Sequence, residues 1–312
     1  MDSAAIGRFE ASRGRLASLA YRLLGSAADA EDAVQDTFLR WQATDRERIM
    51  VPEAWLTKVV TNLCLDRLRS AQARHERAVG VWLPEPLLEG DPMLGPADTF
   101  EQRESVSLAV LTLMERLSPV ERAAYVLREA FSYPHAEIAG ILDITESASQ
   151  QHVHRARRRI TAERRDVDEV DPASARRIVE EFLAAATSGR TERLVAMLTA
   201  DVTAVSDGAG LARRLLRYTT RERIASYVRA GFKSTPAKRR LAGGTPAMHI
   251  VLVNGSPAVL AVVDDRVVGI VAFEVSDGKV ASLHGIAAAD RLARLNEAWQ
   301  QHEPDAPVIN AW

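Results

Sequence analysis

The chain has 312 residues, 47% of them hydrophobic, and its 40 basic and 42 acidic residues leave a formal net charge of −2. These values are typical of a folded chain with two or three domains and exclude a wholly disordered one. The apolar runs are far shorter than the roughly 20 residues that span a bilayer, and the N-terminus has no signal pattern, so we expect a cytoplasmic chain without a membrane partner. The single cysteine, Cys64, lies in a helical apolar pattern, which predicts a core residue and neither a disulfide nor a metal or cofactor site.

An all-helical domain is predicted at residues 1 to 75, because apolar side chains recur at helical spacing from Phe9 onward. Gly25 is suited to end the first helix, and Ser26 is suited to cap the second. The first turns of that second helix carry acidic residues, which the helix dipole favours. Pro52 predicts the first turn of a third helix.

A linker is predicted at residues 76 to 100, where prolines and glycines are frequent. That composition opposes both helix and sheet and is typical of an extended connection. Helical spacing resumes over residues 101 to 165, which predicts a second helical domain.

The second helical domain contains a predicted helix-turn-helix. A helix at residues 135 to 142, a turn at Asp143 that tolerates a left-handed conformation, and a helix from Glu146 fit this motif. One face of the second helix is expected to pack inward, and its residues are Ser149, Val153, Ala156 and Ile160. Its other faces offer glutamines that can read adenine edges and arginines that can neutralise phosphates, which favours DNA binding over a merely solvated basic helix. The predicted DNA contacts are Gln150, Gln151, His154, Arg155, Arg158 and Arg159.

An α+β domain is predicted at residues 172 to 295, followed by a tail at residues 296 to 312. Its helices are expected at residues 172 to 187, 191 to 198 and 220 to 230, with a strand near Val202. Four strands rich in valine and isoleucine follow at residues 248 to 253, 258 to 263, 267 to 275 and 280 to 286. The hairpin-turn pairs Asn254-Gly255, Asp264-Asp265 and Asp277-Gly278 separate them. Helices followed by an antiparallel meander indicate an α+β fold.

Two segments of the first domain carry a family resemblance. Residues 29 to 41, DAEDAVQDTFLRW, resemble the polymerase-clamp-binding helix of the extracytoplasmic-function (ECF) sigma factors. Residues 54 to 69, AWLTKVVTNLCLDRLR, resemble the element by which that family reads the minus-ten promoter region. The resemblance implies two helical sigma domains that bind core RNA polymerase and promoter DNA. Residues 101 to 165 would then read the minus-thirty-five element.

The resemblance also implies which side chains act in each segment. An acidic and polar stripe beside an aromatic residue suits a basic polymerase helix, although a solvated face is the plain alternative; it consists of Asp32, Gln35, Asp36 and Phe38. In the second segment, Trp55, Val59 and Leu63 are expected to pack inward. The side chains expected to stay accessible for minus-ten DNA are Lys58, Thr61, Asn62 and Arg67. By resemblance, Asn62 captures a flipped base, against the alternative of a hydrogen-bonded core amide.

The linker narrows the resemblance. Residues 81 to 86, VWLPEP, look like the linker signature of the sigma subgroup with a fused SnoaL-like domain. This implies an NTF2-like cone, in which a curved sheet wraps helices around a pocket, acting as a built-in regulator that touches the linker and the sigma domains. The predicted regulatory contacts are Trp82, Pro84, Glu85, Asp207, Gly208 and Gly210, with Asp290 and Arg291 as a second candidate pair. The sequence departs from the subgroup at residues 206 to 210 and 287 to 292, so regulation can differ in detail.

Two other function classes compete with this interpretation. SnoaL-like folds include cyclases and isomerases, for which Asp207, His249 and His284 are the available proton-transfer groups. The sequence locates no acid–base pair, so we predict no catalytic residues and favour a pocket for a small-molecule ligand over an enzyme. The second alternative is a helix-turn-helix repressor that binds duplex DNA without polymerase. That alternative leaves the first domain without a role.

Overall fold

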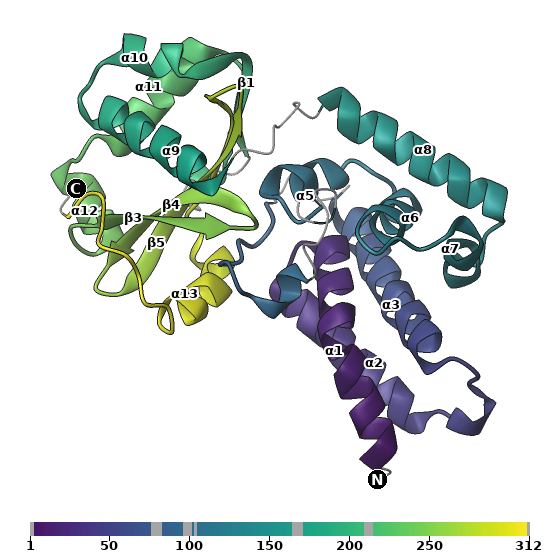
Figure 1. Ribbon diagram of the computed structural model, residues 1–312. Helices are drawn as coiled ribbons and strands as arrows, with labels where there is room; N and C mark the ends of the chain where they lie inside the picture. The colour runs from purple at the N-terminus through teal and green to yellow at the C-terminus, as the bar shows by residue number, and fades with distance from the viewer. Residues whose placement is uncertain are drawn as a thin grey trace. The chain divides into compact units, whose positions relative to one another are not determined.

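The computed structural model describes residues 3–75, 83–95, 102, 105–163, 171–208 and 215–310. The chain separates into two compact units (Figure 1). The first unit consists of Met1–Val79 and Gly90–Arg164, and the second consists of Gly80–Glu89 and Arg165–Trp312. Part of the predicted linker therefore folds with the C-terminal unit.

The first unit begins with three helices. They are α1 (Ser3–Leu24), α2 (Ala27–Ala43) and α3 (Pro52–His75), with a short 3-10 turn, η1 (Arg46–Arg48), before α3. Gly25 has a φ of 65° at the end of α1, and the backbone N–H of Asp29 donates to Ser26 Oγ at 3.2 Å. The end of α1, the cap of α2 and the start of α3 at Pro52 all confirm the prediction.

The rest of the first unit is also helical. It contains η2 (Pro92–Leu94), α5 (Leu108–Met114), α6 (Pro119–Glu129), α7 (His135–Leu142) and α8 (Glu146–Glu163). The predicted helix-turn-helix is confirmed as α7 and α8, and Asp143 between them is left-handed, with φ 55° and ψ 47°. A capping box begins α6, where the Ser118 and Glu121 side chains each accept the other's backbone N–H.

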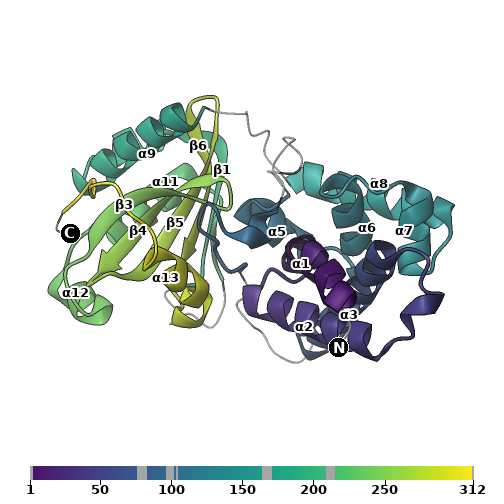
Figure 2. The ribbon, with the colours of Figure 1, turned by 60° about the horizontal axis from the view of Figure 1, so that its bottom comes forward.

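The second unit is a curved six-stranded sheet with helices packed against it (Figure 2). The strands are β1 (Leu198–Ser206), β2 (Leu216–Tyr218), β3 (Ala247–Val253), β4 (Ser256–Val263), β5 (Arg266–Ser276) and β6 (Lys279–Ile286). The helices are α9 (Pro172–Thr187), α10 (Thr191–Ala196), α11 (Arg221–Phe232), α12 (Pro236–Ala242) and α13 (Ala293–Trp299), with η4 (Ala289–Arg291) before the last. The core includes Phe182 of α9, whose ring meets that of Phe273 edge-on at 5.4 Å.

The sheet order is β2-β1-β6-β5-β4-β3. The predicted antiparallel meander is confirmed for β3 to β6, and its turns have the positive φ angles that two-residue hairpins require, 52° at Asn254 and 50° at Asp277. The pairing of β1 with β6 is parallel and was not predicted. Parallel neighbours are joined through distant chain segments, so local periodicity does not reveal them.

Four details of the second unit differ from the sequence prediction. The helix expected to reach residue 198 ends at Ala196, and Leu198 begins β1. Strand β2 and helices α12 and α13 were not predicted. These three elements have only three or seven residues, too few to repeat a hydrophobic pattern, and tertiary contacts stabilise them.

Candidate nucleic-acid interface

Helix α8 presents a polar face beside a buried one. Ser149, Val153, Ala156 and Ile160 are each at most 3% exposed, which confirms the predicted inward face. Ser149 Oγ lies 3.0 Å from His135 Nδ1 at the start of α7, so this face locks the two helices together. The predicted DNA contacts are all exposed: Gln150, Gln151, His154, Arg155, Arg158 and Arg159.

Two of those arginines bind a carboxylate of α6. Glu121 accepts from Arg155 Nε at 3.1 Å and from Arg159 Nη1 at 2.8 Å. Burial raises the pKa of Glu121, but the hydrogen bonds from Ser118 and Arg155 and the charge of Arg159 outweigh it, so the pKa lies below its usual value. Glu121 therefore stays ionised and partly neutralises two of the arginines of α8 that were predicted to contact DNA.

The predicted polymerase stripe on α2 is partly engaged within the unit. Asp32 and Gln35 are exposed, whereas the carboxylate of Asp36 pairs with Arg67 Nη2 at 2.9 Å. The ring of Phe38 lies 4.8 Å from that of Phe9, centre to centre. Arg67 was predicted to contact minus-ten DNA, so the structure joins one residue from each of two predicted sites.

Helix α3 is buried on two adjacent faces. Leu56, Val60 and Cys64 pack in the core, and Leu63 is 9% exposed, but Trp55 and Val59 are only half-buried. The prediction that Thr61 is accessible is wrong, because Thr61 is 0% exposed and its hydroxyl donates to Thr57 O at 2.7 Å. A second group of helices covers this side of α3, which a single amphipathic pattern does not reveal. Lys58, Asn62 and Arg67 remain half-buried.

The covering elements are α7 and its turn. Lys58 Nζ donates to Gly140 O at 2.9 Å and pairs with Asp143 Oδ1 at 2.5 Å. Thr57 Oγ1 lies 3.2 Å from Tyr133 Oη. Within the first unit, the helix predicted to read minus-ten DNA therefore packs against the helix-turn-helix.

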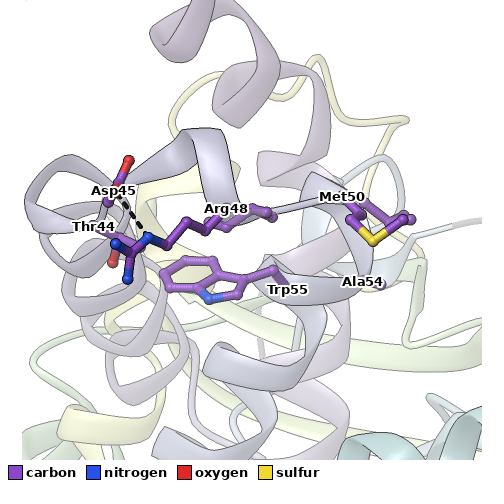
Figure 3. Close-up of a pocket in the computed structure, with 8 residues that line it drawn as sticks. Thr44, Asp45, Arg48, Met50, Ala54 and Trp55 are labelled. Atoms are coloured by element: carbon purple, nitrogen blue, oxygen red, sulfur yellow. Dashed lines mark ion pairs between the residues drawn. The ribbon is translucent and has the colours of Figure 1, made fainter.

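A pocket between α2 and α3 was missed at the sequence level (Figure 3). Its volume is about 560 Å³, and its wall includes Arg48, Met50 and Trp55. Met50 is 97% exposed, and the Trp55 ring lies 5.6 Å from that of Trp41. Figure 3 shows the Trp55 indole beside Arg48, whose Nε pairs with Asp45 at 3.2 Å. An aromatic surface with a cation beside it can stack an unpaired base. The sequence signal for this pocket was the apolar pair Met50-Val51, which lies between Arg48 and Trp55.

In the second unit, the linker is bound to the turn after β3. Asn254 N donates to Leu87 O at 2.9 Å, and Leu87 N donates to Asn254 Oδ1 at 2.8 Å. Glu89 N donates to Leu252 O at 3.0 Å, and Leu88 forms a bridge with Val253. Asn254, chosen from sequence as a turn residue, thus also recognises the linker backbone.

Comparisons with known proteins agree with this arrangement. Residues 8–74 match the model of Sigma-70 region 2, and residues 107–160 match that of Sigma-70, region 4. The ECF RNA polymerase sigma factor SigJ of Mycobacterium tuberculosis is 38% identical over 92% of this chain and 93% of the relative. A probable ECF RNA polymerase sigma factor of the same species, SigI, is 32% identical over 92% of this chain and 94% of the relative. The chain belongs to the ECF RNA polymerase sigma factors.

The crystal structure of M. tuberculosis SigJ resembles this sigma factor in both units. It has a TM-score of 0.69 and 34% identity, covering 93% of this chain and 98% of the other. The predicted fold, two helical sigma domains followed by an α+β NTF2-like domain, is confirmed. As a sigma factor, the protein directs transcription initiation with RNA polymerase. Among the described residues, no helix is both long and apolar enough to cross a membrane.

The predicted regulatory residues have different surroundings in this sigma factor. Pro84 is buried and Glu85 is half-buried in the docked linker, and Arg291 donates to Leu83 O. Asp207 is 4% exposed, and its carboxylate accepts from Ala287 N and Ala288 N at 2.9 and 2.8 Å. Gly208 N donates to Ser206 Oγ at 3.1 Å. Trp82 and Gly210 lie outside the described residues.

The two histidines that an enzyme could use for proton transfer, His249 and His284, are held by contacts within the C-terminal unit. Burial lowers the pKa of His284 to about 4. His249 Nδ1 lies 3.1 Å from Asp305 O, and its ring meets Trp299 at 5.1 Å. His284 is on β6 and His249 is on β3, and the two intervening strands separate them by about 14 Å at about 4.8 Å per strand. The two histidines therefore do not form an acid–base pair with each other.

Proposed function

We propose that this sigma factor works in the cytoplasm by binding core RNA polymerase through α2 and reading promoter DNA through α3 and α8. The observation that carries the assignment of α8 is its exposed polar face beside a fully buried packing face. The α2 contact is supported by Asp32 and Gln35, which are exposed. The alternative of a repressor acting without polymerase does not account for the region 2 match, and no observation favours it.

The first unit as described is a resting form that opens when polymerase binds. The minus-ten and minus-thirty-five elements are about 25 base pairs apart, which is about 85 Å of duplex at about 3.4 Å per pair. A helix whose polar face contacts Gly140 and Asp143 of the helix-turn-helix unit does not reach a DNA site so far away. Promoter reading therefore requires Lys58 to leave its partners.

The pocket beside Trp55 is the place for an unpaired base of the melted minus-ten strand. The aromatic ring supplies a stacking surface, and Arg48 supplies a positive charge for the adjoining phosphate. Asn62 was predicted from the resemblance to capture that base. Trp55→Ala is expected to lower open-complex formation more than Asn62→Ala, because stacking is lost with the ring.

The C-terminal unit acts as a regulator through the linker that it holds. Asn254 holds Leu87 at the turn after β3, and Arg291 of η4 holds Leu83, so the stretch from Leu83 to Glu89 is not free to extend while it is docked. Release of the docked stretch lengthens the connection between the two sigma regions. A small-molecule ligand in the NTF2-like domain is one means of release. Asp207 and Gly208, at the end of β1, remain the candidate residues for regulatory contacts with the linker and the sigma domains.

Transcription with purified core polymerase tests the proposal. The full chain is expected to form a holoenzyme on a native gel and to give transcripts from pooled genomic fragments, with a shared pair of motifs upstream of their 5′ ends. Asn254→Ala, which weakens the linker contact, is expected to change the transcript yield without changing those motifs. Failure to bind polymerase, with duplex binding retained, would contradict the proposed function.

A further inference from the structure

A second concentration of positive charge lies on the C-terminal unit, in a part of the sequence that matches neither sigma region. The sequence from Arg213 to Arg240 has ten lysines and arginines and one acidic residue, Glu222. Five exposed side chains on and around helices α10 to α12 define what we call the basic face: Arg193, Arg229, Lys233, Arg239 and Arg240.

Hydrogen bonds join the three helices into one surface. Lys238 Nζ donates to Gly231 O at 2.7 Å and to Lys233 O at 3.0 Å, which fixes α12 against the end of α11. Arg229 Nη1 donates to Thr191 Oγ1 at 3.1 Å, which joins α11 to the start of α10. The charges of the basic face are therefore held near one another by the fold.

Within the described part of the chain, none of the five side chains of the basic face has a carboxylate within 4.0 Å. Three of the four arginines of α8 differ, because Arg155 and Arg159 share Glu121 and Arg157 pairs with Glu129 at 2.8 Å. Like charges gathered on one surface repel and oppose folding, and protein surfaces commonly intersperse the two signs. An uncompensated basic face therefore fits a polyanionic partner.

We propose that the basic face binds the phosphate backbone of duplex DNA, as a contact separate from α3 and α8. Arginine and lysine on an exposed helical surface suit phosphates, which carry no sequence information. Only eight residues, 164 to 171, separate α8 from α9, so a duplex held by α8 is at high effective concentration for the C-terminal unit. That last step rests on the proposed DNA contact of α8.

The test is the salt dependence of binding between the full chain and a labelled duplex of random sequence, measured by fluorescence anisotropy. Lys233→Gln with Arg240→Gln removes two charges from the basic face. Arg177→Gln with Lys279→Gln removes one arginine and one lysine from exposed positions on α9 and β6, as a matched control. Thermal unfolding of both double variants verifies that each one folds.

The basic-face variant is expected to weaken binding by about 5-fold for one lost phosphate contact and about 30-fold for two, at about 0.15 M salt. The slope of log affinity against log salt is expected to fall by about 0.9 per contact. The control is expected to keep the wild-type slope. Equal effects of the two variants, or no binding of the wild-type chain, would overturn the proposal.

Two further measurements distinguish this proposal from the function of the sigma regions. Gln150→Ala with Arg158→Gln tests α8 in the same assay and in promoter-specific transcription. If this α8 variant loses transcription while the basic-face variant keeps the wild-type salt slope, the proposed DNA contact of the basic face is overturned. The proposed role of α8 in promoter recognition is then supported. If the basic-face variant loses core polymerase binding and keeps its duplex binding, the surface is a polymerase contact and the DNA proposal is overturned.

Discussion

The helical unit and the C-terminal unit use charge in opposite ways. In the helical unit, most arginines and lysines of the candidate DNA surfaces bind acidic partners, as Arg155 binds Glu121 and Lys58 binds Asp143, and Arg158 is the exception among the described residues. In the C-terminal unit, the basic face has no such partners among the described residues, and backbone hydrogen bonds hold the linker instead. A recognisable DNA-binding motif therefore does not show where uncompensated positive charge lies.

The largest expected effect comes from Glu121→Gln, which removes the charge that α8 binds. Loss of a buried carboxylate that holds two arginines and caps α6 is expected to lower the free energy of unfolding by about 3 kcal/mol. The same change frees both arginines, so the salt slope of duplex binding is expected to rise by up to about 1.8. Urea unfolding and anisotropy measure the two effects.

Glu129→Gln is the matched control for that change. Glu129 binds one arginine, Arg157, and has no part in the cap, so its loss is expected to cost about 1 kcal/mol. Equal losses from the two variants would contradict the special position of Glu121. An unchanged salt slope in Glu121→Gln would show that Arg155 and Arg159 do not reach phosphates even when freed.

A smaller effect is expected from Asn254→Ala in the linker contact. Alanine lacks the amide that accepts from Leu87 N and sits at a φ of 52°, so the turn is expected to lose about 2 kcal/mol. Asn254→Gly tolerates that φ and loses only the hydrogen bond to the side-chain amide. Its expected loss of about 1 kcal/mol therefore measures that hydrogen bond alone. Hydrogen exchange at Leu87 N is expected to quicken about 5-fold in the glycine variant.

Exchange at Met248 N supplies the internal reference for the linker contact. This amide donates to Ile309 O at 2.8 Å at the opposite end of β3, where the C-terminal tail pairs. It is expected to keep its wild-type rate in the glycine variant. If both sites quicken together, the change loosens the whole β3 edge and the local account of the linker contact is wrong.

Mild acid is expected to destabilise the C-terminal unit more than the helical unit. Burial lowers the pKa of His284 to about 4, below the unfolded value of about 6.5, so protons bind the unfolded chain first. The C-terminal unit is expected to keep its full stability above about pH 6.5 and to lose about 2 kcal/mol by pH 5. His284→Gln is expected to remove this dependence in urea unfolding.

The helical unit gives the reference for that pH window. The pKa of Glu121 lies below its usual value, so its contribution is present above the unfolded pKa and is lost as the pH falls below about 4.5. Burial and the charge of Arg155 also lower the pKa of His152 on α8, so the helical unit is expected to show a smaller loss between pH 6.5 and 5. A loss in the helical unit as large as that of the C-terminal unit would contradict the contrast between the units.

The smallest expected effect is that of Asp143→Asn, which removes the partner of Lys58 and keeps a residue suited to the left-handed turn. Both side chains are partly exposed, so the stability cost is expected to stay under about 1 kcal/mol. Lys58 is expected to react faster with an acylating reagent, measured by mass spectrometry. High salt should raise the acylation rate of Lys58 in the wild-type chain by the same amount. An unchanged acylation rate in both cases would show that the ion pair with Asp143 does not restrain Lys58.

The sequence by itself determined the family and most of the local elements, though not β2, α12 and α13. Caps, turn pairs and periodicity act over a few residues, so the bounds of α7, the left-handed Asp143 and the β3 to β6 turns were all predictable. Only the tertiary structure decided what those elements meet. Glu121 finds arginines 34 and 38 residues away, and Asn254 finds Leu87 at a separation of 167 residues. Thr61 is buried for the same reason, because the second covering helix comes from a distant part of the chain and leaves no mark on the spacing of α3.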